Sequence, residues 1–249
     1  MAGHSKFKNI MHRKGAQDRM RAKLFSRLGR EILIATRIGG AEIDSNIRLR
    51  SAINSAKSAN MPKDNIARAI KKGEGIDPNS NYEEVRYEGY GPSGAAIIIE
   101  SLTNNKNRTA SEIRTIFSKN GGTLGETGSV SHSFQKLGSI TIEKNIAKEE
   151  DILNFIVESD SVDFEENQDS FVIFCNLKNY HSLIQKITNK FNSPKSSEII
   201  WKSKININIE KDNVEKLIKL INSLEDNEDV QSVSSNFEIS EEIMNQLTK

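Results

Sequence analysis

The spacing of apolar and polar positions divides the chain into a helical first part and a mixed second part. Apolar residues recur every three to four positions over residues 18–38, 46–60 and 63–73. This spacing places them on one face of a helix, and the glycines at 39, 40 and 73 are typical of helix ends. The pattern therefore predicts three short amphipathic helices that pack together as a small helical domain.

From residue 82 onward, short runs rich in β-branched and aromatic residues alternate with helical periods. We expect helices at 108–122, 148–159, 180–191 and 212–226, and strands at 94–102, 129–135, 138–144, 161–166, 170–177, 197–210 and 230–239. Residues 138–202 then have the βαββαβ order of a ferredoxin-like unit. Residues 94–135 and 203–239 each have the order βαβ, and together they would form a second such unit around the first.

These elements predict an α+β protein, with an N-terminal three-helix domain followed by two ferredoxin-like α/β domains, one inserted in the other. We expect a basic arm and helical domain at 1–76 and an inserted α/β domain at 137–202. The remaining residues, 77–136 plus 203–249, would form the discontinuous α/β domain.

Lysine and arginine are concentrated in the helical part. The whole chain has a net charge of only +1, yet residues 1–75 hold 17 Lys or Arg and 6 Asp or Glu, against 18 and 28 in the remainder. Such asymmetry indicates an anionic partner, either nucleic acid or a membrane surface. A membrane-surface helix needs a free apolar face, whereas these helices need theirs for a common core. The pattern therefore favours nucleic acid as the partner and predicts no binding to a membrane.

The first helix and the residues before it supply the candidate contacts. Basic residues share the side of this helix opposite its apolar face, and a stripe of one sign repels itself unless an anion neutralises it. The first eighteen residues have too few apolar positions for a core, so we expect a basic arm that orders on phosphate, with Phe7 stacking on a base. The predicted nucleic-acid contacts are Lys6, Phe7, Lys8, Arg13, Lys14, Arg19, Arg21, Lys23, Arg27, Arg30, Arg37, Arg48 and Arg50.

The sequence gives little support for a catalytic or cofactor-binding site. Residues 89–94 match G-x-G-x-x-G, but Pro92 interrupts the motif and a strand follows where a dinucleotide site needs a helix. The glycine-rich segment 120–129 lacks the lysine of a phosphate loop, and we expect a mobile functional loop there. The four histidines lack metal-ligand spacing, and Cys175 lies in an apolar run typical of a buried thiol. We expect no metal, no cofactor and no catalytic residues; an enzyme with an unrecognised carboxylate site is the alternative.

Several blocks of the sequence resemble the YebC/PmpR family, and the match runs along the whole chain. They include MAGHSK at the start, NMPKDNI at 60–66, YEGYGPSG at 87–94, FSKNGG at 117–122 and LEDNEDVQ at 224–231. Phe7 stands where the family motif usually has Trp, and either ring can stack on a base. The resemblance implies a helical domain followed by two α/β domains, and a non-enzymatic cytosolic regulator of gene expression.

The resemblance leaves two partner classes open. Bacterial members are described as DNA-binding transcriptional regulators, whereas mitochondrial relatives are translational activators, and relief of difficult nascent sequences on the ribosome is attributed to the wider family. We therefore expect a cytoplasmic, DNA-binding transcriptional regulator; the alternative is a ribosome-associated translation factor that contacts ribosomal RNA. The chain has no recognisable helix-turn-helix register or zinc finger, so we expect modest DNA sequence specificity.

Overall fold

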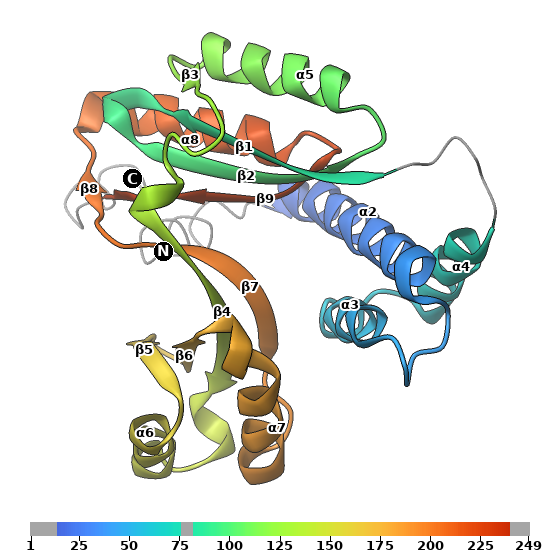
Figure 1. Ribbon diagram of the computed structural model, residues 1–249. Helices are drawn as coiled ribbons and strands as arrows, with labels where there is room; N and C mark the ends of the chain where they lie inside the picture. Colours follow the sequence, from blue (N-terminus) through green and yellow to red (C-terminus); the bar gives the residue numbers. More distant parts are fainter. Residues whose placement is uncertain (1–13, 76–81, 240–249) are drawn as a thin grey trace. The chain divides into compact units, whose positions relative to one another are not determined.

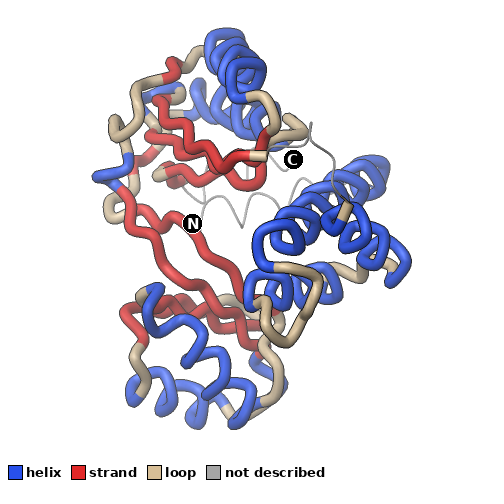
Figure 2. The backbone as a smooth tube through the Cα atoms, turned by 45° about the vertical axis from the view of Figure 1, so that its right-hand side comes forward, coloured by secondary structure: helices blue, strands red, loops and turns tan. Residues whose placement is uncertain are grey.

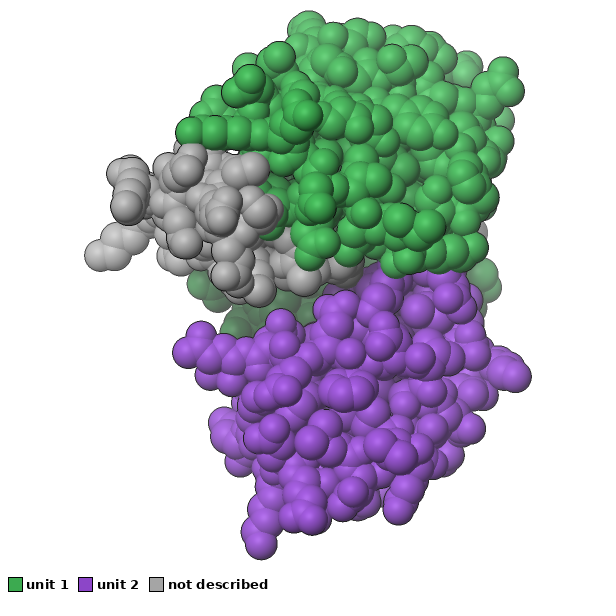
Figure 3. Space-filling model, turned by 90° about the vertical axis from the view of Figure 1, so that its left-hand side faces the viewer, with its two compact units in different colours: residues 1–134, 203–249 green, residues 135–202 purple. Residues whose placement is uncertain are grey.

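The computed structural model describes residues 14–75 and 82–239 of the 249-residue chain. The chain divides into two compact units, residues 1–134 with 203–249 and residues 135–202 (Figure 3). The first unit contains the N-terminal helices together with a four-stranded sheet, and the second is an uninterrupted segment of chain inserted between the parts of the first.

From residue 14 onward, the first unit has three helices in succession, as the periodicity predicts (Figure 2). They are α2 (Lys14–Gly39), α3 (Ile47–Ser58) and α4 (Lys63–Glu74). Asn46 joins the first two, because its side chain accepts a hydrogen bond from the Leu49 N–H and donates to the carbonyls of Ala35 and Gly40. Their apolar faces form one core, made of Ile32, Ala35, Leu49, Ala52, Ile53, Ala56, Met61, Ile66 and Ala69.

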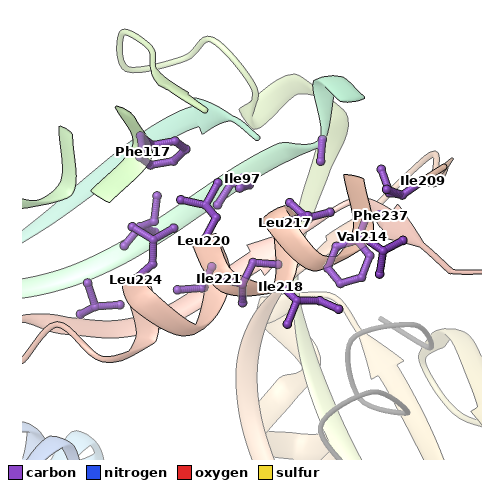
Figure 4. Close-up of a cluster of buried hydrophobic side chains, with 14 of the residues drawn as sticks. Ile97, Phe117, Ile209, Val214, Leu217, Ile218, Leu220, Ile221, Leu224 and Phe237 are labelled. Carbon is purple, nitrogen blue, oxygen red and sulfur yellow. The ribbon is translucent and has the colours of Figure 1, made fainter. Parts of the chain in front are cut away.

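The sheet of the first unit is antiparallel and has the strand order β3-β1-β2-β9 (Figure 1). Its strands are β1 (Glu83–Tyr90), β2 (Ala96–Thr103), β3 (Thr123–Leu124) and β9 (Val230–Ser235). Helices α5 (Lys106–Lys119) and α8 (Lys211–Glu225) share one core with this sheet. Figure 4 shows Leu217 and Leu220 of α8 beside Ile97 of β2, with Phe117 of α5 in the same cluster. A short parallel pair, β8 (Ile207–Asn208) with β10 (Phe237–Glu238), completes the described elements of the unit.

Three features of this sheet differ from the sequence-based expectation, and the first is strand β3, which is not among the predicted strands. Strand β1 is not among the predicted elements either. Most of its residues are polar, and the strand ends at the glycine-rich turn of residues 89–94. The strand predicted at 129–135 is wrong: residues 131–133 form a 3-10 turn, and the next strand begins at Phe134. The reason is the buried carboxylate of Glu88, which accepts the backbone N–H groups of Val130 at 2.8 Å and Ser131 at 2.9 Å. Those donors are therefore not available to a neighbouring strand.

The second unit has the predicted βαββαβ order and the strand order β5-β6-β4-β7 of a ferredoxin-like sheet. Its elements are β4 (Phe134–Glu143), α6 (Glu149–Glu158), β5 (Ser161–Glu166), β6 (Ser170–Cys175), α7 (Tyr180–Phe191) and β7 (Ser196–Ser203). The strand predicted at 197–210 is thus two strands, β7 and β8. Cys175 is fully buried, as predicted, and burial raises the pKa of its thiol. Its core position indicates a packing role.

The α+β class is confirmed, with three N-terminal helices followed by antiparallel sheets and their helices. Across the described parts of the chain, no helix combines the length and the apolar character that a membrane span requires.

Candidate nucleic-acid interface

The basic stripe of α2 comprises Lys23, Arg27, Arg30 and Arg37, and its first three residues meet an acidic turn of the same unit. This acidic turn, Glu225–Asp229, links α8 to β9 and has the sequence EDNED. Lys23 forms an ion pair with the carboxylate of Asp226, and the Arg27 guanidinium donates to the Glu225 carbonyl. Arg30 donates to the carbonyl of Glu228. These three cations recur every three to four residues, so one face of α2 presents all of them to the turn.

The position of the acidic turn at the end of α8 explains why cations gather there. A helix leaves its last carbonyl groups without partners and carries the negative end of its dipole at that terminus. Glu225 is the last residue of α8 and Asp226 is its C-cap. Burial lowers the pKa of Arg27, whereas the charges of Glu225 and Asp226 act in the opposite direction. An arginine keeps its charge in such surroundings, so the contact remains one between cation and anion at neutral pH.

Hydrogen bonds of Asp229 fix the acidic turn to the neighbouring strand β2 and helix α5. Its buried carboxylate accepts hydrogen bonds from Arg108 at 2.6 Å, from Thr109 at 2.7 Å and from Thr103 at 3.1 Å. Its carbonyl accepts the Leu102 N–H at 2.8 Å. Burial alone would raise the pKa of Asp229, but the hydrogen bonds outweigh it and lower the pKa below its usual range. The turn is therefore held to both β2 and α5.

Arg30, a member of the α2 stripe, also lies beside Asp229. Its guanidinium lies 3.5 Å from the Asp229 carboxylate, 3.4 Å from the Leu102 carbonyl and 5.8 Å from the centre of the Tyr82 ring. An open pocket of about 530 Å³ lies beside these groups, with Arg30 and Arg108 among its cationic lining residues. Glu112, together with carboxylates of the acidic turn, also lines the pocket. Because its acidic groups outnumber its cations, this pocket does not suit a phosphate.

The other described residues among the predicted nucleic-acid contacts differ in how far they already bind other groups of the protein. Arg48 forms hydrogen bonds with Glu31 at 2.7 and 3.1 Å and an ion pair with Glu84, and the bonds to Glu31 raise its pKa. Arg37 is half-buried and also has a partner. Arg50 is exposed and donates to the Asp44 carbonyl at 2.8 Å. Arg21 is exposed and lies 5.4 Å from the centre of the Phe25 ring. Arg21 and Arg50 are thus the more accessible members.

Part of the predicted set falls outside the described residues. Lys6, Phe7, Lys8 and Arg13 precede the first described residue. Lys14 and Arg19 lie in α2, but their side chains are not among those described. The contacts assigned to them stay predictions.

Sequence reasoning missed a second group of cations, on α4. Lys63, Arg68, Lys71 and Lys72 are exposed, and we call them the α4 cations. Ile66 and Ala69 face the core from the other side of this helix. Within the described parts of the chain, the three lysines form no ion pair, whereas Arg68 is bonded to Asn65 at 2.7 Å. The same helical periodicity that marked the α2 stripe could have identified them.

The glycine-rich segment, for which the sequence predicts mobility, is tied to β1. Burial of Glu88 favours a raised pKa, but N–H groups of Val130, Gly128 and Ser131 outweigh it and lower the pKa. The Tyr90 hydroxyl also donates to the Ser129 carbonyl at 2.9 Å.

In residues 14–75 and 82–239, no group of three or more His, Cys, Asp or Glu side chains is placed to hold a metal ion.

The segment that matches the dinucleotide motif is a turn. A 3-10 turn covers Pro92–Gly94, and β2 follows it directly. Ser93 and Gly94 have positive φ angles of 60° and 76°. The residues that follow this turn form a strand, so the turn is not followed by the helix that a dinucleotide motif requires.

The fold belongs to the class in which a three-helix domain precedes antiparallel α/β lobes, and comparisons with known proteins identify the family. Residues 5–76 match the model of the TACO1/YebC protein N-terminal domain, and residues 82–237 match that of the TACO1/YebC second and third domain. The chain therefore belongs to the TACO1/YebC family. It is similar to a crystal structure of the conserved hypothetical protein Aq1575 from Aquifex aeolicus, with 41% identity and a TM-score of 0.84. The alignment covers 94% of this chain and 97% of that one.

Proposed function

We propose that this protein is a cytoplasmic, non-enzymatic regulator of gene expression that binds nucleic acid, with DNA as its target. The observation that carries the proposal is the charge of residues 1–75, which hold 17 Lys or Arg against 6 Asp or Glu. Membership of the TACO1/YebC family supports it, because that family is generally regulator-like and non-enzymatic. Clustered cations bind the phosphate backbone whatever the base sequence.

The phosphate contacts come from the helical domain. They comprise the predicted basic arm, the exposed Arg21 and Arg50, and the α4 cations. The α2 stripe contributes only when its contact with the acidic turn opens. This division rests on the ion pair of Lys23 with Asp226 and on the hydrogen bonds of Arg27 and Arg30, which already use the groups that a phosphate would need.

Neutralising the α4 cations tests the proposal. In K63Q/R68Q/K71Q/K72Q, the affinity for a short random-sequence DNA duplex should fall. The slope of log K against log salt should become shallower by about 0.9 for each phosphate that the variant no longer neutralises. Gel-shift or fluorescence-anisotropy titrations over a range of salt concentrations measure both quantities.

A control variant with the same change in charge separates a local effect from a general one. K178Q/K211Q/K216Q/K219Q removes four lysines outside the helical domain. Its affinity and salt slope should stay close to those of the wild type. Equal decreases in the two variants would contradict a phosphate-binding surface on α4.

A ribosome-associated role is the second candidate, and the side chains of the α4 face suit it as well as they suit DNA binding. That face presents ammonium and guanidinium groups, which bind phosphates of structured RNA as readily as those of DNA. Centrifugation of cell extract through a sucrose cushion tests this role. Recovery of the protein with the ribosomal pellet, abolished at high salt and in K63Q/R68Q/K71Q/K72Q, would favour translation over transcription.

A further inference from the structure

The acidic turn offers the α2 stripe the same kind of ligand that nucleic acid offers. Lysine and arginine bind carboxylate, carbonyl and phosphate oxygens through the same N–H donors. In this structure Lys23 binds the Asp226 carboxylate, while Arg27 and Arg30 bind carbonyl oxygens of the turn. These donors are therefore occupied at the positions where a phosphate would bind.

We propose that the acidic turn is an internal competitor of nucleic acid for Lys23, Arg27 and Arg30. In the free protein the turn occupies the α2 stripe, and phosphates reach the stripe only when this contact opens. The inference rests on the proposed nucleic-acid binding and adds a regulatory contact to it.

The acidic turn keeps its conformation when the contact between α2 and the turn opens. Asp229 is fixed by Thr103, Arg108 and Thr109, and the Leu102 N–H holds its backbone. Opening therefore separates α2 from a fixed turn and leaves the turn folded. The Asp229 carboxylate keeps these three partners, so its charge stays satisfied when Arg30 leaves.

The contact is also weak enough for a polyanion to displace it. The Lys23 and Asp226 side chains are 43% and 65% exposed, and exposed ion pairs contribute little to stability. Arg27 binds a neutral carbonyl oxygen of the turn, which a charged phosphate oxygen outcompetes as an acceptor. Arg30 binds the Glu228 carbonyl and also lies 3.5 Å from the Asp229 carboxylate, whose bonds to Thr103, Arg108 and Thr109 remain when Arg30 moves to a phosphate. Release of counterions from nucleic acid adds to the driving force.

Removing the charge of the turn should strengthen binding. In D226N/E228Q, which leaves the anchor Asp229 intact, the affinity for a short random-sequence DNA duplex at low salt should rise about two- to fivefold. The matched control E126Q/E215Q removes two exposed carboxylates elsewhere in the same unit. Its affinity should change by much less, because neither carboxylate lies on the turn.

Chemical cross-linking follows the contact itself in the wild-type protein. A carbodiimide joins an amine to a carboxylate with which it is in contact, so it should link Lys23 to Asp226, and peptide mass spectrometry identifies the product. Saturating duplex should lower the yield of this cross-link. The yield of the Lys186–Asp160 cross-link should not change, since that pair, 3.2 Å apart, lies in the other unit.

The outcomes separate this inference from the proposed function. If the wild type binds the duplex and D226N/E228Q binds no more tightly than the control, the competition is refuted and nucleic-acid binding stands. An unchanged Lys23–Asp226 cross-link at saturating duplex refutes it equally. If neither the wild type nor D226N/E228Q binds DNA or RNA at low salt, both proposals fail.

Discussion

Asp229 is the residue on which the acidic turn depends. Its buried carboxylate accepts three side-chain hydrogen bonds, one of them from the Arg108 guanidinium. In D229A these donors are left without their acceptor, and we expect the free energy of unfolding to fall by about 2–3 kcal/mol. Urea denaturation followed by circular dichroism measures it. D226A, which alters an exposed side chain, should change it by less than about 0.5 kcal/mol. Similar decreases in both variants would show that Asp229 is not the anchor.

The same carboxylate predicts how stability depends on pH. The pKa of Asp229 is lower in the folded protein than in the unfolded chain, where it is about 3.9. Its contribution to stability is therefore complete above the unfolded value and is lost as the pH falls through the folded value. The difference in unfolding free energy between wild type and D229N should shrink below about pH 4. A difference that stays constant down to about pH 2 would contradict the lowered pKa.

At the scale of elements, what the sequence predicts well is local. The three N-terminal helices follow from apolar spacing, and Asn46 is the N-cap of α3, whereas α4 continues past Gly73 to Glu74. Strand β1 could not be predicted because its residues are mostly polar. The turn at 131–133 could not be predicted because it depends on Glu88, whose carboxylate binds backbone groups 42 and 43 residues away. The contact of α2 with the acidic turn joins Lys23 to a residue 203 positions distant. Charge patterning identified the basic stripe but could not show that it meets this turn.

The boundary of α2 makes the predicted basic arm testable as a separate element. The core of the helical domain is formed from Phe25 onward, and α2 begins at Lys14. Deleting residues 1–13 should therefore leave the thermal midpoint close to that of the full chain. Duplex affinity should nonetheless fall, because the deletion removes Lys6, Lys8 and Arg13. Differential scanning fluorimetry and anisotropy titrations measure the two effects. A large fall in the thermal midpoint would show that the arm is structural.

At the scale of the whole molecule, the chain joins a basic helical domain to acidic α/β lobes, and this division limits how it can read DNA. Specific regulators bind their sites about 10³- to 10⁷-fold more tightly than random DNA, through side chains that match base edges in a groove. The α2 stripe and the exposed face of α4 instead present mainly lysine and arginine, and the asparagine that is hydrogen-bonded to Arg68, Asn65, is half-buried. Such faces hold phosphates well and distinguish bases poorly.

We therefore expect less than about 10²-fold preference for a native promoter fragment over a scrambled fragment of equal length. Competition binding at physiological salt measures the ratio, with D226N/E228Q as a companion sample in which the α2 stripe is more accessible. That variant should bind both fragments more tightly while the ratio between them stays the same, because the α2 cations contact phosphates and not bases. A ratio above about 10³ would place sequence readout in residues other than these cations and favour a dedicated transcriptional regulator. A ratio near one, together with recovery on ribosomes, would favour the role in translation.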